Sequence, residues 1–299
     1  MTRTPDKFFG IKTIGMCPGI EEQAHGLAKV AGAKAGTRVE YIATGIDNGS
    51  FITKLHADGV DVLAKLKEMG YFRSDDKLPS KVTQEDPLAE LAWVRADFAL
   101  WREFGFMPGI PDRHMVENFS FFVARSTPEL EYGIKRTSVS ERQARYDTMK
   151  KQIEAVVADP QSHVGGLGHG DDPVVDVIDS LRGLRSLVLG ANYANIGQIP
   201  GVPDRAVVET RCLFDAAGVH PLVSPMPDMV KALILPTIYR QEMVVDIAID
   251  GTFDQLVALM ASDPLCARMK LTDVRQMTKE LMAANATYIA NKKLLEFSH

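Results

Sequence analysis

The sequence predicts an α+β fold in which a few short strands accompany many long helices. Short β-branched and apolar runs, such as residues 38–45 and 186–190, are typical of strands. Long segments such as 227–250 instead have helical character. Hydrophobic residues make up 45% and charged residues 24% of the 299 residues, so we expect a packed core rather than disorder.

The N-terminal part of the chain is predicted to alternate strands with helices. Apolar side chains recur at helical spacing after Ile20, and the Asn48-Gly49 dipeptide favours a tight hairpin turn. Asp58 is expected to cap the helix that follows it. The expected elements are strands at 10–15, 38–45 and 50–55 and helices at 20–33, 58–69 and 86–104.

The remainder of the chain is predicted to be largely helical. Residues 105–112 hold two prolines and two glycines, which end the preceding helix, and the glycine-rich segment 160–172 is expected to be an exposed loop. Pro173 suits the first turn of a helix. The expected elements are helices at 141–157, 173–184, 227–250, 252–261 and 272–295 and strands at 186–190, 207–213 and 219–223.

Charge and composition exclude several classes of function. The formal net charge is −5 and there is no basic tract, so we expect no nucleic-acid partner. There is no secretory signal and no apolar run of about 18 residues, so we expect no membrane partner. Three widely spaced cysteines, Cys17, Cys212 and Cys266, indicate free thiols in a reducing compartment, and we expect a cytoplasmic protein.

The sequence lacks a dinucleotide-binding fingerprint. The run 165–170 has suitable glycines, but it follows a helix and a polar loop instead of a strand. We therefore do not expect this chain to bind NAD alone.

Several segments of the chain carry motifs that occur together in one order. Residues 192–209 resemble the pattern N-x-x-N-x-G-x-I-x-x-L-P-x-x-x-V-V-E. Upstream, residues 11–17 resemble K-x-x-G-L-C-H, residues 45–48 resemble G-x-N-H, and residues 114–122 resemble H-x-x-E-Y-x-P-Y-F. Further matches follow at 218–222, 241–242 and 263–265. In their order and spacing, these motifs together resemble glycoside hydrolase family 4, in the lactate/malate dehydrogenase superfamily.

The resemblance implies a fold and a domain organisation. The fold would be like the C-terminal domain of lactate/malate dehydrogenases, with mixed and antiparallel strands packed against long helices. Residues 1–299 would form the substrate-binding, metal-binding and oligomerisation domain of the family. Residues 1–16 would be the remnant of an NAD-binding domain that lies before Met1.

The resemblance also implies a reaction. Family members use NAD to oxidise the C3 hydroxyl of the sugar, after which a base removes the C2 proton and the glycosidic oxygen leaves. A divalent metal, usually Mn²⁺, polarises the oxygens on C2 and C3. We expect a small sugar or sugar-phosphate substrate and a homo-oligomer, with a separate NAD-binding subunit as an alternative source of the cofactor.

Two metal ligands follow from the resemblance. Cys17 matches the metal-binding cysteine of the family, and a thiolate there would be stabilised by the N-terminus of the next helix and by the metal. Asn48 stands where the family has a histidine ligand, and Pro18 stands where the family has a histidine after the cysteine. Asp47, beside Asn48, is a candidate substrate ligand that could also supply a carboxylate to the metal. A simple turn with positive φ remains the alternative for residues 47–49.

The catalytic residues that follow from the resemblance are His114, Glu117 and Asn118. Asn118 replaces the tyrosine that is a candidate base in the family, and an amide cannot accept a proton. His114 or Glu117 could be the base, although a pair of surface side chains three apart on a helix is an equal alternative. Asn195 is a candidate substrate ligand.

Three functions remain open from the sequence. The first is a glycosidase that depends on NAD and a divalent metal, with this chain supplying the substrate and metal half. The second is a non-catalytic or split-enzyme subunit that keeps the fold, and the third is a sugar dehydrogenase-like relative. We expect the isolated chain to be inactive, since it has no NAD-binding half.

Overall fold

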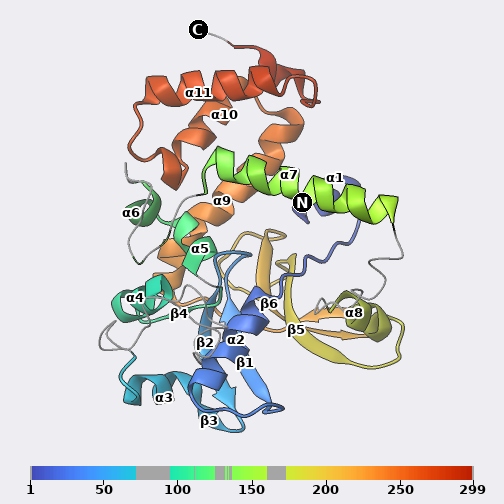
Figure 1. Cartoon of the computed structure of the whole chain (residues 1–299), viewed down its shortest axis with the longest axis vertical. Helices are drawn as coiled ribbons and strands as arrows, with labels where there is room; N and C mark the ends of the chain where they lie inside the picture. The colour runs from blue at the N-terminus through green and yellow to red at the C-terminus, as the bar shows by residue number, and fades with distance from the viewer. Residues whose placement is uncertain are drawn as a thin grey trace.

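The fold is α+β, as the sequence predicts, with antiparallel strands and many helices (Figure 1). A computed structural model describes residues 2–71, 95–110, 112–124, 132, 134, 137–159 and 173–297. The predicted helix 86–104 is therefore described only as α4 (Arg95–Phe104), and the predicted loop 160–172 lies outside the described residues.

The first sheet is built on the predicted hairpin. Strands β1 (Val39–Thr44) and β2 (Phe51–Ala57) pair antiparallel, and β3 (Val60–Asp61) and β4 (Met107–Pro108) pair with β2. Its core side is covered by α2 (Gly19–Val30), α3 (Val62–Glu68) and α4, which share one apolar cluster with it.

The second sheet has the order β5-β6-β7 and is also antiparallel. Its strands are β5 (Leu187–Ala194), β6 (Val207–Asp215) and β7 (Gly218–Pro221), and α8 (Val174–Leu181) packs against it. An isolated bridge joins Gly45, just after β1, to Glu209 in β6. The end of the first hairpin is therefore tied to the middle of the second sheet.

Two expectations for the first sixty residues are wrong. Residues 10–15 form no strand, because only Gly15 pairs, in a bridge to Asn192, and an unpredicted helix α1 (Arg3–Phe9) precedes them. Asp58 does not cap a helix. It lies in the turn between β2 and β3 with φ of 46°, and Asp61 is the N-cap of α3, accepting a hydrogen bond from the backbone N of Ala64 at 3.0 Å.

The helical part of the molecule is organised by α9 (Asp228–Asp250), which runs from the sheets to the layer of α10 (Phe253–Ala261) and α11 (Leu271–Ala284) (Figure 1). Shorter helices in the described residues of this part include α5 (Asp112–Met115), η3 (Val116–Asn118), α6 (Ser120–Val123) and η6 (Pro264–Cys266). Helix α7 (Val139–Ala158) begins at a capping box and is exposed along its whole length.

The predicted terminal helix 272–295 is too long. Helix α11 ends at Ala284, and a separate short helix η7 (Lys292–Leu295) follows. The physical reason lies in Asn291, whose side chain donates to the carbonyl oxygens of Ile247 and Gly251 at 3.1 and 2.8 Å. This anchor on the end of α9 requires the chain to turn back.

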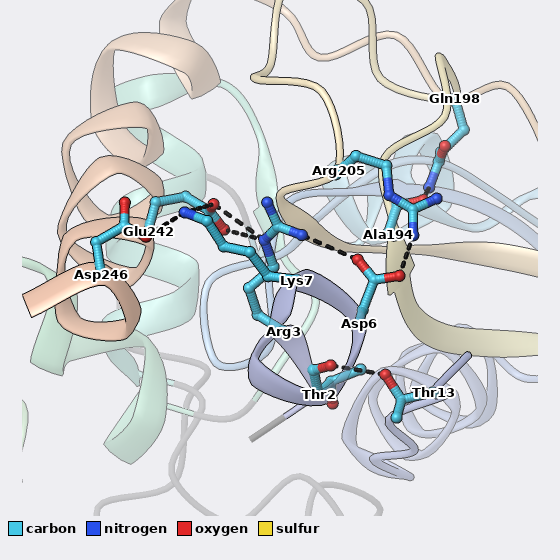
Figure 2. Close-up of polar contacts among 10 residues, drawn as sticks. All are labelled: Thr2, Arg3, Asp6, Lys7, Thr13, Ala194, Gln198, Arg205, Glu242 and Asp246. Carbon is cyan, nitrogen blue, oxygen red and sulfur yellow. Dashed lines mark hydrogen bonds and ion pairs between the residues drawn. The ribbon is translucent and has the colours of Figure 1, made fainter. Parts of the chain in front are cut away.

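Helix α1 buries no residue and is held by charged contacts (Figure 2). Arg3 pairs with Glu242 of α9 at 3.0 Å and with Asp6 at 2.9 Å. Asp6 also pairs with Arg205, and Lys7 pairs with Asp246 of α9. The N-terminal helix therefore links α9 to the loop between β5 and β6. None of the helices in the described ranges is long and apolar enough to span a membrane.

Candidate functional site

The candidate site starts at the turn between β1 and β2. Gly45 has φ of 148°, and a Cβ there would lie 2.4 Å from the carbonyl oxygen of Gly49. Asn48 has φ of 61°, and the backbone N of Gly49 donates to the carbonyl oxygen of Ile46 at 2.9 Å. The sequence therefore forces a tight loop whose tip presents Asp47 and Asn48.

Asn118 fixes this turn from the opposite side. Its Nδ2 donates to the carbonyl oxygen of Asn48 at 2.6 Å and to that of Met115 at 3.2 Å. The side chain of Asn118 thus holds the turn that presents Asp47 and Asn48. This contact between residues 70 apart could not be seen in either motif alone.

Cys17 lies beside Asp47, immediately before α2. Burial raises the pKa of the Cys17 thiol to about 11, against the effect of the backbone N–H of Gly19, and the charges of Asp47 and Glu209 raise it further. Without a metal, the helix N-terminus is therefore not enough to hold Cys17 as a thiolate, and the metal-bound thiolate stays a prediction. Desolvation and nearby negative charge outweigh the helix end.

Glu209 is a functional candidate that the sequence motifs did not single out. Its side chain is 1% exposed, and burial raises its pKa to about 8. The neighbouring Ser50 and Asn192 side chains lower this pKa, while the charge of Asp47 raises it. The sequence feature that could have identified Glu209 is an acidic residue within an apolar strand, at the end of the 192–209 motif.

A cavity of about 540 Å³ brings most of the predicted site residues together. Asp47 and Asn48 line it from the first hairpin, and His114, Glu117 and Asn118 line it from α5 and η3. The other side is formed by α9 and the helices and turns after it: Thr237, Arg240, Gln241, Val244, Ile247, Ala248, Leu256, Leu259, Met260, Asp263, Pro264, Met282, Ile289 and Leu294.

Asn195 lies away from this cavity. It is 2% exposed, and its Nδ2 donates to the carbonyl oxygens of Ile199 and Val202 at 3.2 and 3.0 Å. Its Oδ1 accepts from the backbone N of Gly197 and of Ile199 at 3.3 and 3.1 Å. These contacts are those of a residue that shapes a loop, and the same N-x-x-N-x-G motif explains them.

The donors near Cys17 fit a divalent cation in charge and type. The charge of the Asp47 carboxylate raises the pKa of both the Cys17 thiol and the buried Glu209, and a cation between these groups would oppose that rise. Among the described residues, however, no group of three His, Cys, Asp or Glu side chains is arranged to hold a metal. The amide of Asn48 would have to complete the set.

Comparisons with known proteins agree on the family. The family described as the family 4 glycosyl hydrolase C-terminal domain matches residues 43–266. The chain is 30% identical over 213 residues to an alpha-galacturonidase of Thermoanaerobacterium saccharolyticum, covering 67% of this chain and 43% of that protein. It is 25% identical over 300 residues to an alpha-galacturonidase of Thermoanaerobacter italicus, covering 95% of this chain and 64% of that protein. The chain thus spans less than two thirds of the length of these relatives.

Solved structures share the fold. LplD of Bacillus subtilis superposes with a TM-score of 0.76 at 24% identity, covering 92% of this chain and 64% of that one. A 6-phospho-alpha-glucosidase from gut microorganisms, in complex with NAD and glucose-6-phosphate, gives a TM-score of 0.73 at 16% identity over 97% and 64% of the chains. A 6-phospho-alpha-glucosidase from the same source with NAD and Mn²⁺ gives 0.65 at 12% identity over 93% and 61%. Because the family match covers residues 43–266, most of the chain, the chain belongs to family 4 of the glycosyl hydrolases and carries the C-terminal domain of that family.

Proposed function

We propose that this chain is the substrate- and metal-binding part of a glycosidase that cleaves an O-glycosyl bond by oxidation and elimination, with NAD and a divalent metal. The observation that carries the proposal is the convergence of the Asp47-Asn48 turn and the η3 residues on one cavity, beside Cys17. Relatives crystallised with NAD, Mn²⁺ and glucose-6-phosphate support both cofactors and a small sugar substrate for this site.

The residues would divide the work between the two sides of the cavity. Cys17 and Asn48 would hold the metal, which supplies Lewis-acid polarisation of the sugar oxygens when it is bound. Asp47 would orient a sugar hydroxyl, or give the metal a carboxylate. Asn195 would act indirectly, through the loop that it shapes.

Proton transfer falls to His114 or Glu117. Both side chains are exposed to the cavity, and either can accept a proton from carbon, whereas the amide of Asn118 cannot. Asn118 instead positions the turn through its bond to the carbonyl oxygen of Asn48. NAD would come from a further part of the protein or from a separate subunit, within a homo-oligomer. Cysteines 17, 212 and 266 are free among the described residues, which suits a reducing, cytoplasmic setting.

A second candidate is a non-catalytic or split-enzyme subunit that keeps the fold. One observation favours it, namely that Asn118 uses its amide to hold Asn48 where the family has a base and a ligand. Both replacements weaken the chemistry but leave the cavity intact.

The proposal is tested by Mn²⁺ binding to the purified chain, measured by calorimetry. We expect binding that is lost in Cys17→Ser and weakened in Asp47→Asn, with Cys266→Ser as the matched control that leaves it unchanged. Unaltered Mn²⁺ binding in Cys17→Ser would sink the metal assignment. Mixing the chain with the NAD-binding domain of a family member then separates the two candidates, because only a catalytic half restores hydrolysis of an aryl α-galacturonide.

A further inference from the structure

One face of α9 lines the same cavity as the candidate site residues of the first hairpin and η3. Its lining residues recur at intervals of three, one, three, three and one positions, which places them on a single side of a helix. They are Thr237, Arg240, Gln241, Val244, Ile247 and Ala248. Most of the wall beyond Gln241 is apolar, so the polar groups gather at the end of the cavity nearer the start of α9.

Arg240 is held in place at this wall. Its Nη2 donates to Oγ1 of Thr237 at 2.6 Å, and its Nη1 donates to the carbonyl oxygen of Ser262 at 3.4 Å. Both partners are neutral. Burial lowers the pKa of Arg240, and the charge of Asp263 raises it only in part. Within the described part of the chain, no carboxylate lies within ion-pair distance of this guanidinium.

The contacts of Arg240 also bring it near the candidate site. Ser262 and Asp263 lead directly into η6, and η6 packs against η3, which carries Glu117 and Asn118. Arg240 is the one Lys or Arg among the described lining residues, facing a cavity that also holds the carboxylates of Asp47, Glu117 and Asp263.

We propose that Arg240 is the anion-recognising residue of this cavity and pairs with a negatively charged substituent of the sugar, a carboxylate or a phosphate. The planar guanidinium can donate two parallel hydrogen bonds to either oxyanion while Thr237 and Ser262 hold its other side. Without such a cation, the three carboxylates of the cavity would repel an anionic sugar. The inference rests on the proposed function, because it presumes that a sugar occupies this cavity.

The test measures binding of galacturonate, glucose 6-phosphate and galactose to the folded chain by ligand-detected NMR, with Mn²⁺ present. We expect one of the two anionic sugars to bind at least about tenfold more tightly than galactose. Arg240→Gln should weaken binding of that anionic sugar to about the level of galactose, and Arg240→Lys should retain part of the preference. Arg275→Gln, which removes a guanidinium paired with Asp254 elsewhere in the helical layer, is the matched control and should behave like the wild type.

The possible results distinguish a failure of this inference from a failure of the proposed function. The anionic sugar that binds more tightly identifies the substituent that the site recognises, a carboxylate or a phosphate. If the anion preference persists in Arg240→Gln, the proposed role of Arg240 is wrong, although the proposed function stands. Equal binding of all three sugars by the wild type would lead to the same conclusion. If no sugar binds the wild type at all, the proposed function fails, and this inference fails with it.

Discussion

The buried carboxyl of Glu209 makes the stability of the metal-free chain depend on pH. The folded protein raises the pKa of this group from 4.5 to about 8, chiefly by burial. A group with a raised pKa contributes stability that is complete below pH 4.5, since both states then bind the proton, and that is lost as pH rises to about 8. The difference corresponds to about 5 kcal/mol of unfolding free energy, a large part of the stability of an ordinary domain.

Replacing Glu209 by glutamine should remove this dependence. The amide resembles the protonated acid in shape and carries no charge, and the main-chain bond from residue 209 to the carbonyl oxygen of Gly45 is retained. We expect Glu209→Gln to match the wild type at pH 4.5 and to exceed its unfolding free energy at pH 8 and above, by up to about 5 kcal/mol. Urea denaturation followed by circular dichroism, in EDTA, measures both proteins across this range.

The difference in unfolding free energy between the wild type and Glu209→Gln isolates the contribution of Glu209, because all other titrating groups are common to both proteins. A difference that stays constant from pH 4.5 to 8 would refute the reasoning. Glu154→Gln, in the exposed helix α7, is the matched control and should follow the wild-type curve throughout. If a cation binds beside Asp47 and Glu209, addition of Mn²⁺ to the wild type at pH 8 should recover part of the unfolding free energy that is lost at this pH.

Three further perturbations test other parts of the structure. Asp6→Asn removes a carboxylate that is 8% exposed and that ties α1 to Arg205. Urea denaturation should show an unfolding free energy lower by about 1–3 kcal/mol, and an unchanged midpoint would contradict the contact network. Gly45→Ala should lower the melting temperature strongly, because the new Cβ would lie 2.4 Å from a carbonyl oxygen, whereas Gly36→Ala has open space around it and should cost only the strain of its φ of 82°; equal losses would count against the turn geometry. The pKa of Cys17 is about 11, against 9.0 for a free cysteine, so at pH 8 it should hold about a hundredfold less thiolate. Its alkylation, followed by peptide mass spectrometry, should therefore be slow at pH 8 and faster at higher pH; fast alkylation at pH 8 would contradict the burial.

Patterns along the chain predicted much of the local structure. The Asn48-Gly49 hairpin was predictable because asparagine and glycine adopt positive φ at low cost, and Asn48 does so here. The long helices were predictable from spacing and length. The failures came where a distant group decides the outcome, as when Asn291 binds the end of α9 and ends the predicted terminal helix.

The sequence by itself determined the α+β class, the family resemblance, and five of the residues that line one cavity, because motifs and periodicity are local properties of the chain. Only the tertiary structure decided what surrounds them. It set Asn118 against the Asn48 turn, buried Glu209 next to Asp47, and placed Arg240 across the cavity. Burial and through-space charge depend on segments far apart in the chain, so the pKa of Cys17 rose where the helix end alone predicted that it would fall.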